Sequence, residues 1–140
     1  GGNSTAIKGV VAEFGDGWIP VLPTPEQIAE GLLKVKDRMK QFGRSPESLQ
    51  VAYGGSGCLV IAENEELVRK LAKPLVHSMG KSLEKQTCLI GTPEQCIQKI
   101  EKYQRAGAHK IVAGFYDFPS LDGMRLFAKE VIPHFSVRKR

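Results

Sequence analysis

The sequence is poor in the residues that would point directly to a disulfide scaffold or a metal site. It has three cysteines and three histidines among 140 residues. Cys58, Cys88 and Cys96 show no Cys-x-x-Cys spacing, and each lies in or beside an apolar run. This pattern predicts buried free thiols in a reducing compartment. We therefore expect a cytoplasmic protein.

Metal ligands and long apolar runs are also missing. His77, His109 and His134 lie far apart in the sequence and share no ligand spacing, so we expect no metal site and assign none of them to catalysis. No apolar run approaches the roughly 20 residues that a membrane span requires, and no signal-peptide pattern is visible. Neither a membrane span nor a membrane partner is expected.

The charge balance is moderately basic, with 20 Lys and Arg against 15 Asp and Glu and a formal net charge of +5. Such an excess could serve a phosphate group or a nucleic acid. The basic residues are spread over the expected solvent faces of helices, apart from the tail Arg138–Arg140, and no aromatic-rich basic strand of an RNA-binding type occurs. Solvated surface is the favoured interpretation, and no nucleic-acid partner is expected.

The most informative stretch runs from residue 89 to residue 116, and it predicts a helix followed by a strand. Thr92 is a good N-cap, Pro93 occupies the first helical position, and Gln95 follows the cap by three residues. This is the pattern of a capping box. Residues 110–116 form a mostly apolar run without polar alternation, which is typical of a parallel strand buried on both faces.

The same opening occurs earlier, because residues 24–27 repeat Thr-Pro-Glu-Gln. A helix is predicted from there to about Phe42, followed by a strand over residues 49–62. Good helix starts are common in α/β proteins, so the repeat need have no evolutionary meaning. The strand contains the glycine-rich run 54–57, which suggests a bulge or the close approach of a ligand. A P-loop is excluded, because no Gly-Lys-Ser/Thr follows.

The remaining segments complete an alternating α/β pattern. We expect a helix from Ser4 to Gly15, a strand over residues 16–22, a helix after Asn64 that Pro74 kinks or splits, and a last helix over residues 121–132. A chain of this length forms one domain with a real core.

The first four residues, Gly1, Gly2, Asn3 and Ser4, open directly into a helix. Glycines let the backbone approach a ligand, and a helix start offers amide groups, so this stretch could bind a phosphate. A plain helix cap by Asn3 or Ser4 explains the same residues. The tryptophan at position 18 is the only one, and it points into a cofactor pocket or fills the core.

Four segments in order resemble the carboxyl-terminal half of the luciferase-like monooxygenase family. They are GGNSTAIKGVVAEFGDGWIP, LQVAYGGSGCLVIAENEELVRKLAKP, IGTPEQCIQKIEKYQRAGAHKIVAGFYDFP and MRLFAKEVIPHF. Each motif alone is moderately specific, but together they cover nearly the whole chain. The resemblance implies an α/β fold, namely a partial (β/α)8 TIM barrel, with parallel strands alternating with helices.

The same resemblance implies a function. Members of the family are oxidoreductases that use FMN or the deazaflavin coenzyme F-420 on a small organic substrate. The expected domain is residues 1–140, without the first half of the barrel. Because the sequence does not begin with Met, we expect a removed start or a piece of a longer protein. The alternative is a non-catalytic flavin-binding or assembly module from a truncated barrel.

The family's Gly-Gly-x-Ser turn contacts the cofactor phosphate, which implies that role for Gly1, Gly2, Asn3 and Ser4. The resemblance also implies that further strand-end residues face the cofactor pocket, namely Trp18, Gly114 and Phe115.

The residues that follow the last predicted strand do not identify a catalytic group. The most plausible polar candidates are Tyr116 and Asp117, although loop capping explains Asp117 equally well, and no residue is named as catalytic. A half-barrel would expose the inner face and the edges of its sheet. We therefore expect a homo-oligomer or pairing with a complementary half-barrel.

Overall fold

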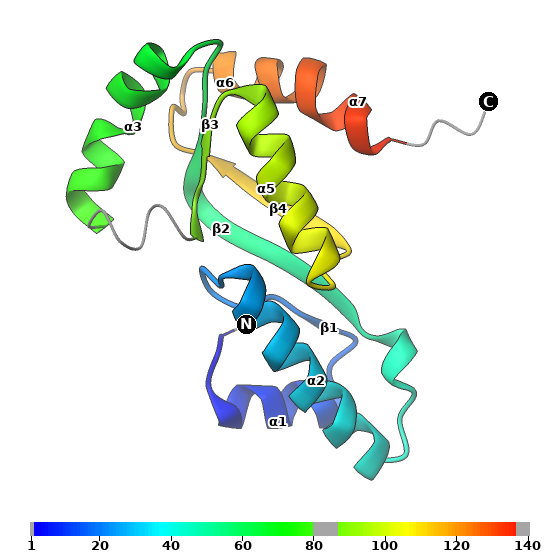
Figure 1. The fold of residues 1–140 in the computed structure, drawn as a ribbon. Coiled ribbons are helices and arrows are strands. Elements are labelled where there is room, and N and C mark those ends of the chain that lie inside the picture. Colours follow the sequence, from blue (N-terminus) through cyan, green and yellow to red (C-terminus); the bar gives the residue numbers. More distant parts are fainter. Residues whose placement is uncertain (1, 80–86, 137–140) are drawn as a thin grey trace. The chain divides into compact units, whose positions relative to one another are not determined.

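The computed structural model describes residues 2–79 and 87–136, so Gly1, the tail Arg138–Arg140 and most of the loop before Thr87 lie outside the described residues. Helices alternate with parallel strands, as predicted (Figure 1). The described strands form one four-stranded sheet in the order β1-β2-β3, with β4 also paired to β2. The α/β fold class is therefore confirmed.

The chain divides into two compact units, each with its own packing. Unit 1 comprises residues 1–54 and 102–112, and unit 2 comprises residues 55–101 and 113–140. Three elements begin in one unit and end in the other, namely β2 (Gln50–Ile61), α5 (Pro93–Arg105) and β4 (Lys110–Phe115). The expectation of a single domain stays a prediction.

Unit 1 contains α1 (Thr5–Phe14), β1 (Gly17–Trp18), α2 (Pro25–Gln41) and a short 3-10 turn at Pro46–Ser48. Strand β1 runs parallel to the start of β2, with Gly17 opposite Gln50, and a single bridge joins Val21 to Gly54. The strand is shorter than the predicted 16–22. Prolines at positions 20 and 23 lack the N–H that a longer ladder needs.

The two helices of unit 1 begin where the sequence predicted. Ser4 accepts a hydrogen bond from the amide of Ile7 at 3.2 Å and caps α1. Thr24 and Gln27 form the expected capping box of α2, with reciprocal hydrogen bonds of 3.2 and 2.9 Å. Helix α2 ends at Gln41, one residue before the predicted end at about Phe42, and Phe42 is 47% exposed.

The core of unit 1 forms around aromatic side chains. The rings of Tyr53 and Tyr103 lie 4.3 Å apart, and the Tyr103 hydroxyl donates to the carbonyl of Pro23 at 2.8 Å. The indole of Trp18 lies against Gly31 of α2, where a Cβ atom would come within 2.2 Å of the ring. Only a glycine permits this approach of helix to strand.

Arg44 joins the loop after α2 to the carboxyl end of α1. Its guanidinium donates to the carbonyls of Val11, Ala12 and Gly15 at 3.3, 3.0 and 2.9 Å. The Val11 carbonyl also accepts from the Gly15 amide at 2.9 Å. The Ala12 carbonyl is one of the last helix carbonyls, which have no intrahelical partner, so the guanidinium supplies a donor where the helix supplies none. Its ion pair with Asp16, at 3.4 Å, involves a fully exposed carboxylate.

We expect Arg44→Ala to lower the free energy of unfolding by about 1–3 kcal/mol, because partly buried helix carbonyls lose their donors. Thermal and urea unfolding measure this loss. Asp16→Ala is the matched control and should cost less than about 0.5 kcal/mol, since it removes only the exposed ion pair. Equal losses in the two variants would contradict the capping role.

Unit 2 contains α3 (Glu65–Met79), β3 (Leu89–Gly91), α6 (Asp122–Leu126), a π-helical turn (Phe127–Val131) and α7 (Ile132–Phe135). Strand β3 runs parallel to the end of β2, with its first residue opposite Leu59. The sequence analysis missed β3, because three residues carry no detectable period. Helix α3 continues through Pro74, so the helix is not split there, and the alternative of a kink stays a prediction.

The last helical segment differs from the prediction of one continuous helix. Phe127 and Val131 are buried, whereas Leu121, Met124 and Ile132 are exposed. A π-helical turn adds a residue per turn, so side chains on either side of it leave the stripe that a period of 3.6 predicts. Among the described residues, no helix is long and apolar enough to cross a membrane.

Cys96 lies on the buried face of α5 and is 1% exposed, with its sulfur 3.8 Å from the carbonyl of Gly91. Burial raises the pKa of the Cys96 thiol to about 12, and the nearby Lys99 ammonium opposes this shift. The unfolded chain ionises near the ordinary value of 9.0. The contribution of the Cys96 thiol to the free energy of unfolding is therefore fully present below pH 9.0. It is lost as the pH rises toward the pKa of the thiol in the folded chain.

We expect the stability advantage of the wild-type chain over Cys96→Ala to shrink by about 1 kcal/mol between pH 8 and pH 10. Urea denaturation at each pH gives the two free energies of unfolding. The cavity left by the substitution contributes equally at both values, so only the thiol changes the difference. A constant difference would show that the thiol ionises normally in the folded chain.

Candidate functional site

The amino end of α1 and the loop after β1 are held together in unit 1. The indole nitrogen of Trp18 donates to the carbonyl of Gly2 at 2.9 Å. The side-chain amide of Asn3 accepts from the Val21 amide at 2.9 Å and donates to its carbonyl at 2.8 Å. The structure thus brings Gly2, Asn3 and Trp18 together, next to Ser4 at the start of the helix.

The start of α1 can serve both as a cap and as an anion site. Ser4 uses its oxygen to accept from Ile7, and its hydroxyl proton can still be donated. By helix geometry, the first amides of α1 have no intrahelical partner. Gly2 adopts φ +101°, and a Cβ atom here would meet only the Ile7 side chain, at 3.4 Å. The capping role is observed, and the phosphate role stays a prediction.

A small cavity of about 200 Å³ lies beside this helix start, and Asn3, Lys8 and Trp18 contribute to its lining. The ammonium of Lys8 lies 5.9 Å from the centroid of the Trp18 ring. Trp18 itself is 1% exposed, so its ring chiefly fills the core of unit 1. Its contact with a cofactor stays a prediction, whereas Lys8 adds a positive charge that the sequence analysis did not single out.

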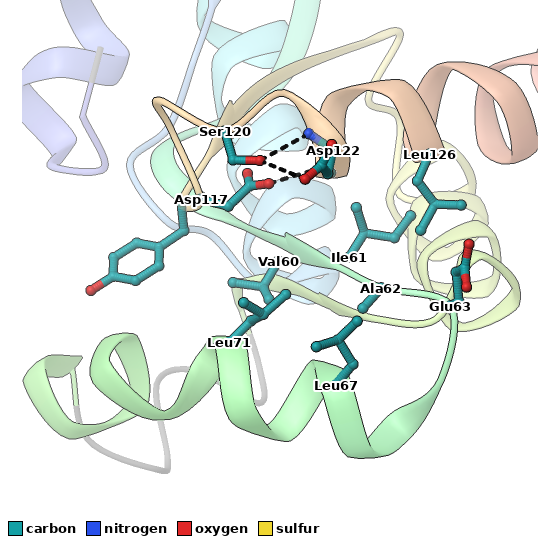
Figure 2. A pocket seen from close by; sticks show the side chains of 12 residues that line it. Val60, Ile61, Ala62, Glu63, Leu67, Leu71, Asp117, Ser120, Asp122 and Leu126 are labelled. Carbon is teal, nitrogen blue, oxygen red and sulfur yellow. Dashed lines mark hydrogen bonds between the residues drawn. The ribbon is translucent and has the colours of Figure 1, made fainter.

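A larger pocket of about 620 Å³ lies in unit 2, where β2 and β4 end (Figure 2). One wall is formed by the end of β2 and by α3, and it consists of Val60, Ile61, Ala62, Glu63, Leu67 and Leu71. The opposite wall follows β4 and consists of Tyr116, Asp117, Ser120, Asp122, Gly123 and Leu126. Ligands of α/β proteins commonly bind at the carboxyl ends of parallel strands.

The wall that follows β4 is a hydrogen-bonded turn. Asp117 accepts from the amide of Gly123 at 2.9 Å. Ser120 donates to the Asp122 carboxylate at 3.0 Å and accepts from the Asp122 amide at 3.2 Å (Figure 2). Loop capping is therefore what the structure shows for Asp117. These bonds fix the rim of the pocket.

Gly114 and Phe115 stand at the end of β4, and neither lines this pocket. The ring of Phe115 packs edge-on against Phe127, with centroids 5.7 Å apart. The next two residues, Tyr116 and Asp117, do line it. The predicted cofactor contacts of Gly114 and Phe115 stay predictions.

Several lining residues escaped the sequence analysis, among them Glu63, Leu67, Leu71 and Asp122. The sequence offered one signal for these residues, because they belong to the segments that follow two predicted parallel strands. Such strands end at the same edge of the sheet, so the segments after them come together there. Within the described ranges, no group of three His, Cys, Asp or Glu residues is placed to hold a metal ion.

Comparison with known proteins gives structural relatives only. No protein-family profile matches the sequence, and no curated protein is significantly similar to it. The fold is similar to the coenzyme F420-dependent tetrahydromethanopterin reductase from Methanopyrus kandleri, with 20% identity, a TM-score of 0.74, and coverage of 96% of this chain and 50% of that one. An F420-dependent secondary alcohol dehydrogenase matches with 19% identity, a TM-score of 0.76 and coverage of 97% and 47%.

A type II Baeyer-Villiger monooxygenase of Pseudomonas putida, solved in complex with FMN, matches with 15% identity, a TM-score of 0.66 and coverage of 94% and 46%. These relatives have the luciferase-like barrel fold, and the chain spans about half of their length. At these identities the likeness establishes the fold. The partial barrel that the sequence resemblance implied is confirmed.

Proposed function

We propose that this chain is part of an oxidoreductase of the luciferase-like monooxygenase family, which binds FMN or coenzyme F420 and acts on a small organic substrate. The observation that carries the proposal is the fold likeness. It extends over 94% to 97% of the chain and includes two F420-dependent enzymes and one that contains FMN.

The start of α1 fits the phosphate group of such a cofactor. Gly2 has no side chain, and a Cβ atom there would meet only the Ile7 side chain. By helix geometry the amides of Thr5 and Ala6 have no intrahelical partner, and Ser4 retains a proton to donate. Lys8 lines the adjacent cavity and contributes a positive charge. Asn3 holds the loop at Val21 and so fixes the shape of this end.

When bound, the flavin or deazaflavin supplies the redox chemistry. The residues of this chain anchor and orient the cofactor, and the apolar walls of the unit 2 pocket exclude water. The second candidate function is a non-catalytic flavin-binding or assembly module. It is favoured by the hydrogen bonds of Asp117, Ser120 and Asp122, which serve the loop itself. Cofactor binding without turnover would identify this case.

We also place the protein in the cytoplasm. Cys96 is a free and buried thiol, which is the usual state of a cysteine in a reducing compartment.

Fluorescence titration with FMN and with F420 tests the cofactor site. We expect saturable binding of one of them, weakened about tenfold by Ser4→Ala, because a hydrogen bond to a charged group is lost. The dephosphorylated forms of both cofactors should bind the two proteins equally, since they lack the group that Ser4 contacts.

Asn64→Ala is the matched control, because it removes a helix cap in unit 2, where Asn64 accepts from Leu67 at 2.9 Å. It should leave cofactor binding unchanged. If neither FMN nor F420 binds the wild-type chain, the proposed function is wrong for this chain. If Asn64→Ala weakens binding as much as Ser4→Ala does, the effect comes from stability and the phosphate site is not supported.

The proposal includes a partner that covers part of the sheet in unit 1. Ile19, Val21 and Val112 are apolar and between 46% and 60% exposed. Ile19 and Val112 flank Gly54, whose added Cβ atom would lie 2.7 Å from the first side chain and 3.8 Å from the second. They therefore share one face of the sheet. We propose that a second copy or a complementary half-barrel covers this face.

Analytical ultracentrifugation tests self-association. We expect the wild-type chain to form dimers or larger species, and Val112→Lys to shift it toward monomer by placing a charge in the apolar face. Leu33→Lys is the control, because Leu33 is exposed on α2 and lies outside this face. A wild-type chain that stays monomeric at high concentration would contradict self-association.

A further inference from the structure

We infer that the unit 2 pocket takes a small apolar molecule that carries a hydroxyl or ammonium group and no negative charge. The inference rests on the proposed function in one respect only, since it treats this pocket as the place of the molecule acted on. It concerns the chemistry of the lining, which no comparison assigns.

The pocket is large and its inner surface is apolar. At about 620 Å³ it lies within the size range of small-molecule sites. Val60 and Ile61 are buried at the end of β2, while Leu67 and Leu71 face them from α3 (Figure 2). Leu126 adds an apolar side chain from the segment after β4. An apolar molecule would bind here mainly by leaving water.

The charged groups of the lining are all carboxylates. Among the residues that the structure describes, Glu63, Asp117 and Asp122 contribute to the lining, and no Lys or Arg does. The nearest cation in the described turn is Arg125, which lies 3.6 Å from Asp122 and is itself exposed. A carboxylate or phosphate on the ligand would meet like charges as it left water, and such juxtapositions are strongly unfavourable.

The hydrogen-bonding capacity of the lining points to a donor on the ligand. Ionised carboxylates only accept hydrogen bonds. One oxygen of Asp117 accepts from Gly123. On Asp122, one oxygen accepts from Ser120 and the other pairs with Arg125 at 3.6 Å, so the acceptor positions for a ligand lie on the second oxygen of Asp117 and on Glu63. Hydroxyl and ammonium groups donate, so both suit this lining. The phosphate end of a cofactor does not suit it, in contrast to the start of α1.

Three naphthalene probes of similar shape test the inference, namely 2-naphthalenemethanol, 2-naphthylmethylammonium and 2-naphthoate. The full chain is titrated with each at neutral pH, and probe fluorescence is followed. We expect saturable binding of the alcohol and of the ammonium compound, and at least about tenfold weaker binding of the carboxylate. Equal affinity for all three, or no saturable binding of any, would overturn the inference.

Two charge reversals locate the effect. Glu63→Lys should lower the affinity for the ammonium compound and raise the affinity for the carboxylate, by about two- to fivefold each, as expected for a partly exposed charge pair. The affinity for the alcohol should stay unchanged. Glu66→Lys is the matched control, because Glu66 is exposed near the start of the same helix but does not line the pocket. Equal shifts in both variants would assign the effect to net charge and overturn the placement.

Leu67→Trp should narrow the pocket and weaken binding of the alcohol. The outcomes also separate this inference from the proposed function. If the probes bind as expected and no flavin binds, the proposed function fails and the pocket inference stands. If a flavin binds and the probes do not, the pocket inference fails alone.

Discussion

Parallel hydrogen bonding along β2 is the constraint on which the rest of the structure depends. In unit 1 the start of β2 pairs with β1, and the Val51 carbonyl accepts from His109 at the start of β4. In unit 2 its end pairs with β3, and Leu59 accepts from Tyr116. Parallel strands need crossover connections, which explains the helices between them. In unit 2 they also place the carboxyl ends of β2 and β4 at the same edge, where the polar residues of the pocket lie.

Much of the fold could be predicted, because helix starts are encoded locally. Thr24 and Thr92 each form reciprocal hydrogen bonds with the glutamine three residues later, as their spacing indicated. Strand β3 and the π-helical turn could not be predicted in this way. Three residues carry no period, and a π-helical turn breaks the period that would reveal the buried side. Trp18 left two interpretations open because a large apolar ring suits both a core and a pocket.

The two candidate sites also differ in how far they could be predicted, because one is built from residues adjacent in sequence and the other from two distant segments. The start of α1 is continuous in sequence, so Gly2, Asn3 and Ser4 could be singled out, and the structure adds the bonds to Trp18 and Val21. The unit 2 pocket joins the residues after β2 to those after β4, more than fifty positions later. Only the pairing of the two strands brings them together, and no short motif encodes that pairing.

The two candidate sites also differ in charge, and under the proposed function this difference would sort a phosphorylated cofactor from its substrate. The start of α1 offers amide donors, a hydroxyl and the Lys8 ammonium, and the carboxylate of Glu30, which also lines its cavity, is paired with Lys34 at 2.6 Å. The unit 2 pocket instead offers carboxylates over an apolar surface. An anionic group gains hydrogen bonds at the first and meets like charge at the second. Binding at the wrong site is therefore penalised by electrostatics as well as by shape. The net charge of +5 does not reveal this sorting, because it sums over surface residues that take part in neither site.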